Sequence, residues 1–199
     1  MRVKEMRALS APDHEPPGAA ARQWIPGRTA AALVNIIGVF VVPAGFVLYF
    51  FLWARGRAAG GGSFGIAQLL LGIAVTLALI AVLLVAHEAM HAVSMRVFGA
   101  RPRVGLTRIG GKIPAVYCIA PGTRFSRLQY LAIALAPLVV IGGGCALIVA
   151  VVPFGGWLVV PAAVHLAGCV GDVVLAGAAL RQPPRTLIEE LPAGLKFYR

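Results

Sequence analysis

The sequence predicts an all-α integral membrane protein, a bundle of four transmembrane helices with a short β-hairpin between helices two and three. Three observations carry this prediction. Of the 199 residues, 59% are hydrophobic and only 13% are charged, whereas about a quarter of an ordinary soluble domain is charged. Four apolar runs are each long enough to cross a bilayer. The basic residues gather in the segments that join and flank these runs.

The two ends of the chain are polar. Residues 1–28 contain four prolines and precede the first apolar run, so we expect a mostly disordered tail and no cleavable signal peptide. Residues 181–199 form a second polar tail. The membrane domain is therefore expected over residues 29–180.

The first two spans differ in what they carry. Residues 29–53 contain no charged side chain and end in an aromatic cluster, which is typical of a membrane–water interface. Residues 64–98 are uncharged until they reach the sequence His-Glu-Ala-Met-His at residues 87–91. The helical pattern continues beyond this motif, and Gly99 is the expected stop of the helix.

The longest connection, residues 100–126, follows the second span. Two runs of residues that favour β-structure, 104–109 and 112–119, stand on either side of Gly110-Gly111. This pattern predicts a β-hairpin. Because proline has no N–H to donate, Pro114 restricts the second run to an edge or irregular strand.

The third span covers residues 128–152 and is interrupted by Pro137 and by three consecutive glycines. The fourth span covers residues 157–180 and carries His165 and Asp172. An even number of spans places both chain ends on the same side of the membrane.

Basic residues set the expected topology. Sixteen of the 18 lysines and arginines lie in the two tails and the central connection, whereas Arg55 and Arg57 lie on the opposite face. The positive-inside rule places both termini in the cytoplasm, in a multi-pass protein of the cell membrane. The net charge of +11 does not indicate nucleic acid as a partner, because no basic helix face or basic patch with interleaved aromatic residues appears.

The strongest chemical signal is the HExxH motif. On a helix, His87 and His91 lie one turn apart, about 6 Å along the axis and on one face, so both imidazoles can bind one Zn²⁺ ion. Glu88 follows the first histidine directly. This position suits a general base that takes a proton from a metal-activated water.

Acidic residues inside the apolar spans give a second argument. Of the seven acidic residues, only Glu88 and Asp172 lie within a span, where an ionisable group costs roughly 2.5–3.5 kcal/mol. A bound Zn²⁺ would offset that cost, and zinc needs a third protein ligand. Asp172 is the preferred third ligand. His165 is the alternative, or it contacts a substrate carbonyl or oxyanion, or it is a histidine hydrogen-bonded between helices.

A structural cluster without metal is the competing interpretation of these polar residues, with imidazole and carboxylate side chains hydrogen-bonded between helices. The three cysteines, Cys118, Cys145 and Cys169, are odd in number and widely spaced. They indicate neither a disulfide framework nor a CxxC zinc site. We interpret them as small buried hydrophobic residues.

These motifs carry a family resemblance. With HEAMH in the second span and Gly171-Asp172 in a late span, the chain resembles small bacterial four-span proteins called putative zincin peptidases, of the DUF3267 type. More remotely, it resembles the site-2 protease clan of intramembrane zinc metalloproteases. The resemblance covers residues 30–180 and includes the segment 124–130 that leads into Ala136-Pro137-Leu138.

The resemblance implies His87 and His91 as zinc ligands, Glu88 as the base and Asp172 as the third ligand. Site-2 proteases usually carry this aspartate in an Asn- and Pro-rich stretch that ends in Leu-Asp-Gly, whereas this chain reads Cys-Val-Gly-Asp-Val at residues 169–173.

The expected function is that of an intramembrane or juxtamembrane zinc metalloprotease, with the bilayer and a membrane protein or peptide substrate as partners. An edge of the 104–119 hairpin could pair with an extended substrate. Two alternatives remain open. One is a non-proteolytic metal-binding protein, such as a sensor, a regulator or a transporter subunit. The other is a pseudo-protease that binds membrane partners. The sequence does not indicate an oligomeric state.

Overall fold

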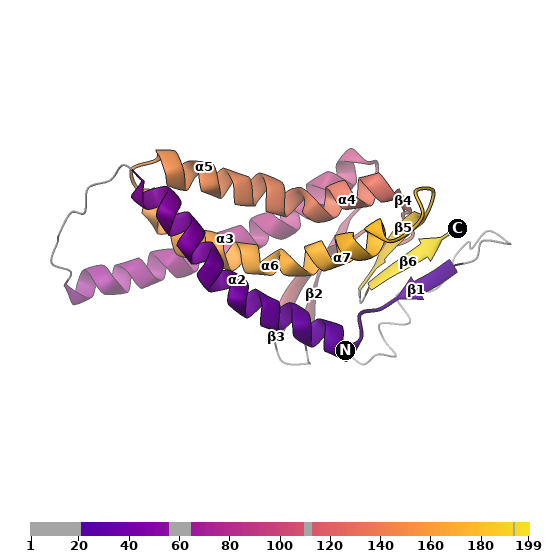
Figure 1. The fold of residues 1–199 in the computed structure, drawn as a ribbon, viewed down its shortest axis with the longest axis horizontal. Helices are drawn as coiled ribbons and strands as arrows, with labels where there is room; N and C mark the ends of the chain where they lie inside the picture. The colour runs from indigo at the N-terminus through magenta and orange to yellow at the C-terminus, as the bar shows by residue number, and fades with distance from the viewer. Residues whose placement is uncertain (1–20, 56–64, 110–112, 193) are drawn as a thin grey trace. The chain divides into compact units, whose positions relative to one another are not determined.

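A computed structural model of the chain describes residues 21–55, 65–109, 113–192 and 194–199 (Figure 1). The chain divides into two compact units. Unit 1 comprises Met1–Ala31, Glu88–Ala136 and Asp172–Arg199, and unit 2 comprises Ala32–His87 and Pro137–Gly171.

Within the described residues, four helical stretches are long and apolar enough to cross a membrane, as predicted. They are Thr29–Ala54, Ile66–Val97, Arg127–Val151 and Gly155–Leu180. The first two are the single helices α2 (Arg28–Ala54) and α3 (Ile66–Val97). The third and fourth are composite and are built of these elements: α4 (Arg127–Ala136), π-helix η1 (Pro137–Gly142) and α5 (Gly143–Val151), then 3₁₀-helix η2 (Gly155–Leu158), α6 (Val159–Gly168) and α7 (Val170–Leu180).

Gly99 ends helix α3, as the sequence predicts. Its φ angle of 79° is left-handed, a conformation that costs glycine little. The Gly99 N–H donates to the carbonyl of Arg96 at 2.9 Å, and the Ala100 N–H donates to that of Met95 at 3.0 Å. These two bonds form a Schellman motif, which satisfies carbonyls at the helix end.

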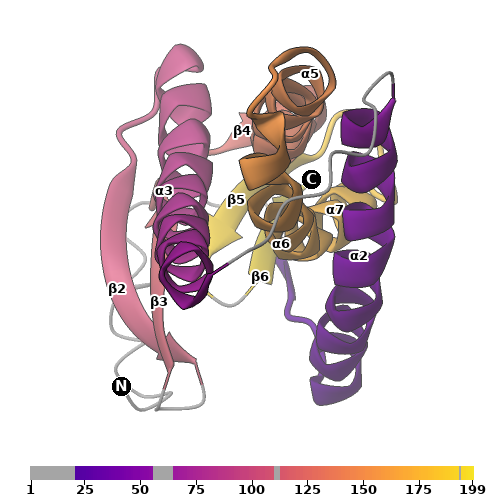
Figure 2. The same ribbon diagram turned by 90° about the vertical axis from the view of Figure 1, so that its left-hand side faces the viewer.

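The predicted hairpin is present in unit 1. Strand β2 (Arg103–Ile109) pairs antiparallel with β3 (Ile113–Ile119), and the two run side by side in Figure 2. Pro114 lies opposite Arg108 in this register. Residues 110–112, where the Gly-Gly turn was expected, lie outside the described residues.

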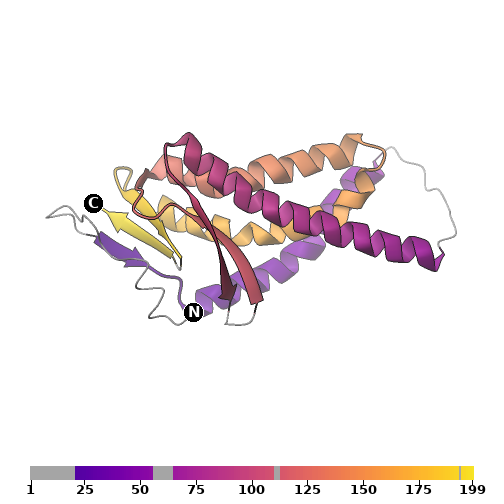
Figure 3. The same cartoon turned by 180° about the vertical axis from the view of Figure 1, so that it is seen from behind.

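The all-α expectation is wrong in one respect, because unit 1 also holds a four-stranded antiparallel sheet in the order β1-β6-β5-β4. Its strands are β1 (Ala21–Trp24), β4 (Phe125–Ser126), β5 (Leu187–Leu191) and β6 (Gly194–Tyr198). Figure 3 shows β1 beside β6. Strand β1 lies within the segment 1–28, and β5 and β6 lie within the segment 181–199.

The physical reason for the sheet is that the polar C-terminal segment alternates. Ile188, Leu195 and Phe197 are at most 2% exposed and pack into the core of unit 1. A close backbone contact fixes β1: a Cβ atom on Gly194 would lie 2.2 Å from the carbonyl oxygen of Trp24. The C-terminal segment is polar on average, but its strands bury one face, and an average over the segment does not indicate this alternation.

The core of unit 1 joins this sheet to three helices. Met95 of α3, Tyr130 and Ile133 of α4, and Ala179 of α7 are each no more than 1% exposed and belong to one cluster with Phe125 of β4. Burial of these side chains fixes the ends of α3, α4 and α7 in unit 1 against one another.

Unit 2 is packed through small residues and one buried hydroxyl. A Cβ atom on Gly45 of α2 would lie 3.2 Å from the Cα of Ala163 in α6, so glycine permits a close helix approach there. Tyr49 of α2 donates a hydrogen bond to the carbonyl of Gly142, at 3.1 Å, at the end of the π-helix.

Large apolar side chains remain exposed along α2 and α3. Phe40 is 70% exposed and Ile66 is 77% exposed. Apolar surface of this extent is unfavourable in water, and it matches the length and composition of helices that could span a bilayer.

Candidate metal centre

The HExxH motif lies within one continuous helix. Helix α3 runs from Ile66 to Val97 and carries His87 and His91 one turn apart, about 6 Å along the axis. The division between the two units falls between His87 and Glu88. His87 therefore belongs to unit 2, and Glu88 and His91 belong to unit 1.

In unit 1, a backbone carbonyl orients His91. The Nδ1 of His91 lies 3.1 Å from the carbonyl oxygen of Ile133 in α4. A carbonyl only accepts, so this bond places the ring proton on Nδ1 and leaves the lone pair of Nε2 for another partner. In an α-helix the donor to this carbonyl would be residue 137, which is a proline and has no N–H.

Asp172 lies at the other nitrogen of the same ring. The Nε2 of His91 and the Oδ1 of Asp172 are 3.5 Å apart, with 12% and 15% of the two side chains exposed. Two ligands that bind one tetrahedral zinc ion at about 2.0–2.1 Å lie about 3.3 Å from each other. The separation in unit 1 therefore fits two ligands of one metal ion.

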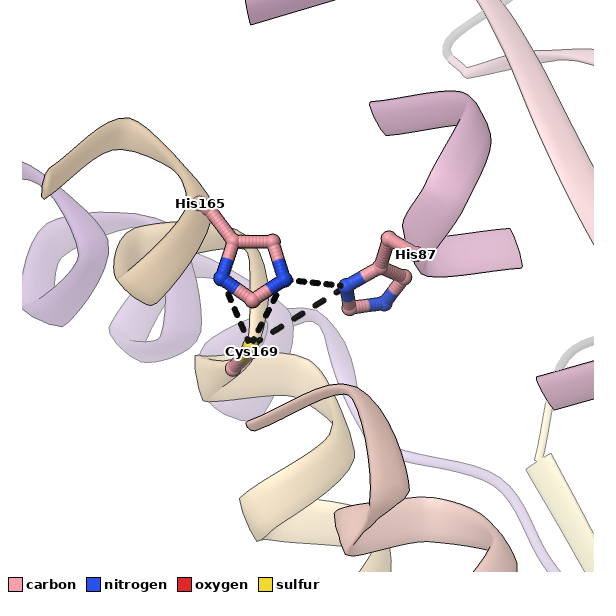
Figure 4. A group of neighbouring side chains, drawn as sticks. All are labelled: His87, His165 and Cys169. Atoms are coloured by element: carbon pink, nitrogen blue, oxygen red, sulfur yellow. Dashed lines mark hydrogen bonds between the residues drawn. The ribbon is translucent and has the colours of Figure 1, made fainter. Parts of the chain in front are cut away.

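In unit 2, His87 meets His165 and Cys169 (Figure 4). The Nδ1 of His87 lies 3.4 Å from the Nε2 of His165 and 4.0 Å from the Sγ of Cys169. The same sulfur lies 3.9 Å from both ring nitrogens of His165. These three side chains are types that hold metal ions, and their ligand atoms lie close enough to hold one.

Sequence reasoning named His165 but missed the neighbouring cysteine. His165 is 2% exposed and Cys169 is 1% exposed. The four-residue spacing of His165 and Cys169 on a predicted helix was the available signal, because side chains at that spacing share a face. A search for CxxC pairs alone does not detect it.

The charge of Glu88 contributes to the pKa of a thiol in strand β3 of unit 1. Burial, with the nearby carboxylates of Glu88 and Glu190, raises the pKa of the Cys118 thiol in β3 to about 11. Glu88 is itself half-buried. It therefore belongs to a region that is only partly exposed to solvent.

Glu190 is the second residue that sequence reasoning missed. Burial raises the pKa of the Glu190 carboxyl in β5 to about 7. His91 acts to lower this pKa, whereas the charges of Asp172 and Glu88 raise it further. The period of two along a strand puts Glu190 on the same face as buried Ile188. That alternation was visible in the sequence, but the segment was interpreted as a polar tail.

Comparison with known protein families gives a match over the central part of the chain. The model of the family DUF3267, described as putative zincin peptidase, matches residues 80–187 of the chain. That range includes the HExxH motif, the hairpin, His165, Cys169 and Asp172. No curated protein and no solved structure matches the chain.

Proposed function

The chain belongs to the putative zincin peptidase family, and from that premise we propose that it is a zinc metallopeptidase that cleaves peptide bonds within or beside a membrane. The observation that carries this proposal is the 3.5 Å approach of His91 Nε2 to Asp172 Oδ1. It joins the last ligand of the HExxH motif to a carboxylate 81 positions later in the chain.

The proposed zinc ligands are His87, His91 and Asp172. His91 and Asp172 have the separation that two zinc ligands need, and His87 lies one helical turn before His91 on α3. Two imidazoles and one carboxylate are a donor set of catalytic zinc, which leaves a fourth position open. A bound zinc ion supplies a Lewis acid and lowers the pKa of a water ligand toward 7.

Glu88 is the proposed general base. It accepts a proton from the attacking water and then delivers that proton to the leaving amine. The Ile133 carbonyl keeps the proton of His91 on Nδ1 during this cycle. Each of these steps uses a group that α3 or α4 holds in place.

We place the reaction at a membrane because four helices of the described chain could span one. The distribution of basic residues supports a cytoplasmic location of both termini. Substrates are then membrane proteins or peptides that reach the site in an extended form. In the described part of the chain, β2 and β3 pair only with each other, so either outer edge can pair with such a substrate.

The test compares purified full-length wild type with Glu88→Gln, using unwound transmembrane peptides in detergent. Glu88→Gln should retain zinc and lose cleavage by at least about 100-fold, the scale of a lost general base. Glu189→Gln is the matched control, because it removes a carboxylate from β5 and should leave cleavage unchanged. Equal activity of Glu88→Gln and wild type contradicts the proposal.

One observation supports a second candidate, a metal-binding membrane protein that does not cleave peptides. His87 faces His165 and Cys169, and histidine and cysteine are the residue types that bind zinc at structural sites. A sensor or regulator of this kind predicts zinc in the purified protein without hydrolysis that depends on Glu88. A pseudo-protease that only binds membrane partners predicts no stoichiometric zinc.

A further inference from the structure

We propose that His87, His165 and Cys169 form a second metal site, for a thiophilic divalent cation such as Zn²⁺, that uses the Nδ1 nitrogen of His87. The site lies wholly in unit 2 and is drawn in Figure 4. Its coordination is independent of the peptidase proposal.

The distances support a common ion. Two nitrogen ligands of a tetrahedral zinc ion lie about 3.3 Å apart, and a nitrogen and a sulfur ligand lie about 3.6 Å apart. The nitrogens of His87 and His165 are separated by 3.4 Å. The Sγ of Cys169 lies 3.9 Å from both ring nitrogens of His165 and 4.0 Å from the Nδ1 of His87. An inward shift of the sulfur by a few tenths of an ångström completes the triangle.

Local structure holds two of the three ligands on one face. Helix α6 ends at Gly168, and the Cys169 N–H still donates to the carbonyl of His165 at 3.2 Å. This bond keeps His165 and Cys169 one turn apart across the break between α6 and α7. Both side chains therefore reach the same imidazole of α3.

The chemical setting differs from that of the other buried thiol in unit 2. Cys145 packs in an apolar cluster with Tyr49 and Val149, which suits a small hydrophobic residue. Cys169 instead faces two imidazoles. A cation there would bind the sulfur as thiolate and release its proton to solvent.

The shared histidine has a consequence that rests on the proposed function. A neutral imidazole offers one lone pair, because its other nitrogen carries the proton. His87 therefore serves either the peptidase zinc or the second site, but not both at once. A cation at the second site withdraws His87 from the peptidase ligands, so the two sites compete.

The test is a Co²⁺ titration of the metal-stripped full-length protein in detergent, in a His91→Ala background that removes the proposed peptidase site. The readouts are bound cobalt and the near-ultraviolet absorption that a cobalt–thiolate bond produces. One Co²⁺ per chain with this absorption is expected. Cys169→Ser should abolish the absorption, and the matched control Cys145→Ser should keep it.

Absence of thiolate absorption, or absorption that survives Cys169→Ser, overturns the second site. Should Cys169→Ser fail to fold, His165→Gln takes its place and must weaken Co²⁺ binding at least about tenfold, and an unchanged titration overturns the inference. The two proposals fail separately. Cleavage by Glu88→Gln at the wild-type rate removes the peptidase and leaves the cobalt signal, whereas loss of all cobalt binding in the His91→Ala background removes the second site.

Discussion

The imidazole Nδ1 of His91 lies 3.1 Å from the carbonyl oxygen of Ile133, and the residue four positions after Ile133 is a proline. Proline cannot donate an N–H to that carbonyl. The break that Pro137 imposes on the third span therefore leaves a backbone acceptor for a proposed zinc ligand. A helix defect and the orientation of this proposed zinc ligand have the same origin.

The first prediction concerns Pro137→Ala. The substitution gives residue 137 an N–H that competes with His91 for the Ile133 carbonyl, so zinc affinity should fall about 10- to 100-fold, as for other lost partners of ligating histidines. The helix itself should not be weakened, because alanine favours the helix interior. Competition with a chromophoric zinc chelator measures the affinity.

Pro43→Ala is the control for this experiment, because Pro43 also lies inside an apolar helix, α2. It should leave zinc affinity unchanged. Equal losses of affinity in both variants would show that proline removal acts through the helices in general and not through His91.

The second prediction separates the two candidates for the third ligand. Asp172→Asn keeps the size of the side chain and removes its charge, and it should weaken zinc binding by at least about 100-fold, near 2.8 kcal/mol. His165→Gln should cost the peptidase site less, because His165 faces Nδ1 of His87. Zinc titration of both variants in a Cys169→Ser background measures which substitution lowers zinc affinity more. A larger loss of affinity in His165→Gln would make His165 the third ligand in place of Asp172.

Local chemistry made much of the fold predictable. Runs of about 25 apolar residues leave few alternatives to a helix, so the four spans agree with the sequence to within a few residues. Gly99 ended its helix as expected because few residues other than glycine adopt a left-handed φ without strain. The β2–β3 hairpin followed from two β-favouring runs around a glycine pair.

Features that depend on distant partners were not predictable in the same way. Strand β5 pairs with β4, which lies 62 positions earlier in the chain, and with β6, which follows it after a short turn. Amino-acid composition does not indicate such pairing. Glu190 and Cys169 gain their surroundings only through tertiary contacts with α3. The HExxH pair needed no tertiary information, because one helical turn sets its spacing.

The third prediction is a pH dependence in metal-free protein. Burial raises the pKa of Glu190 from 4.5 to about 7. Between pH 4.5 and about 7, Glu190 is ionised in the unfolded chain but keeps its proton in the folded chain. The free energy of unfolding therefore falls as the pH rises through this window and levels off above it. Glu190→Gln should remove roughly 2 kcal/mol of this fall.

Thermal unfolding in detergent with a chelator, at pH 5 and at pH 8, measures the effect. Glu189→Gln is the neighbouring control and should keep the wild-type difference between the two pH values. An unchanged difference in Glu190→Gln would assign the pH dependence to other groups.

The fourth prediction concerns the glycine that ends the HExxH helix. Gly99 has a φ of 79°, and a Cβ atom there would meet nothing within 4 Å. Gly99→Ala therefore carries backbone strain without a steric clash and should destabilise the protein by about 1 kcal/mol.

Gly143→Ala is the control with the opposite expected sign, because Gly143 is helical and a Cβ atom there would have equally open space around it. It should stabilise by about 0.5–1 kcal/mol. Apparent melting temperatures should thus move in opposite directions, and a loss in both variants would mean that packing, and not φ, decides these positions.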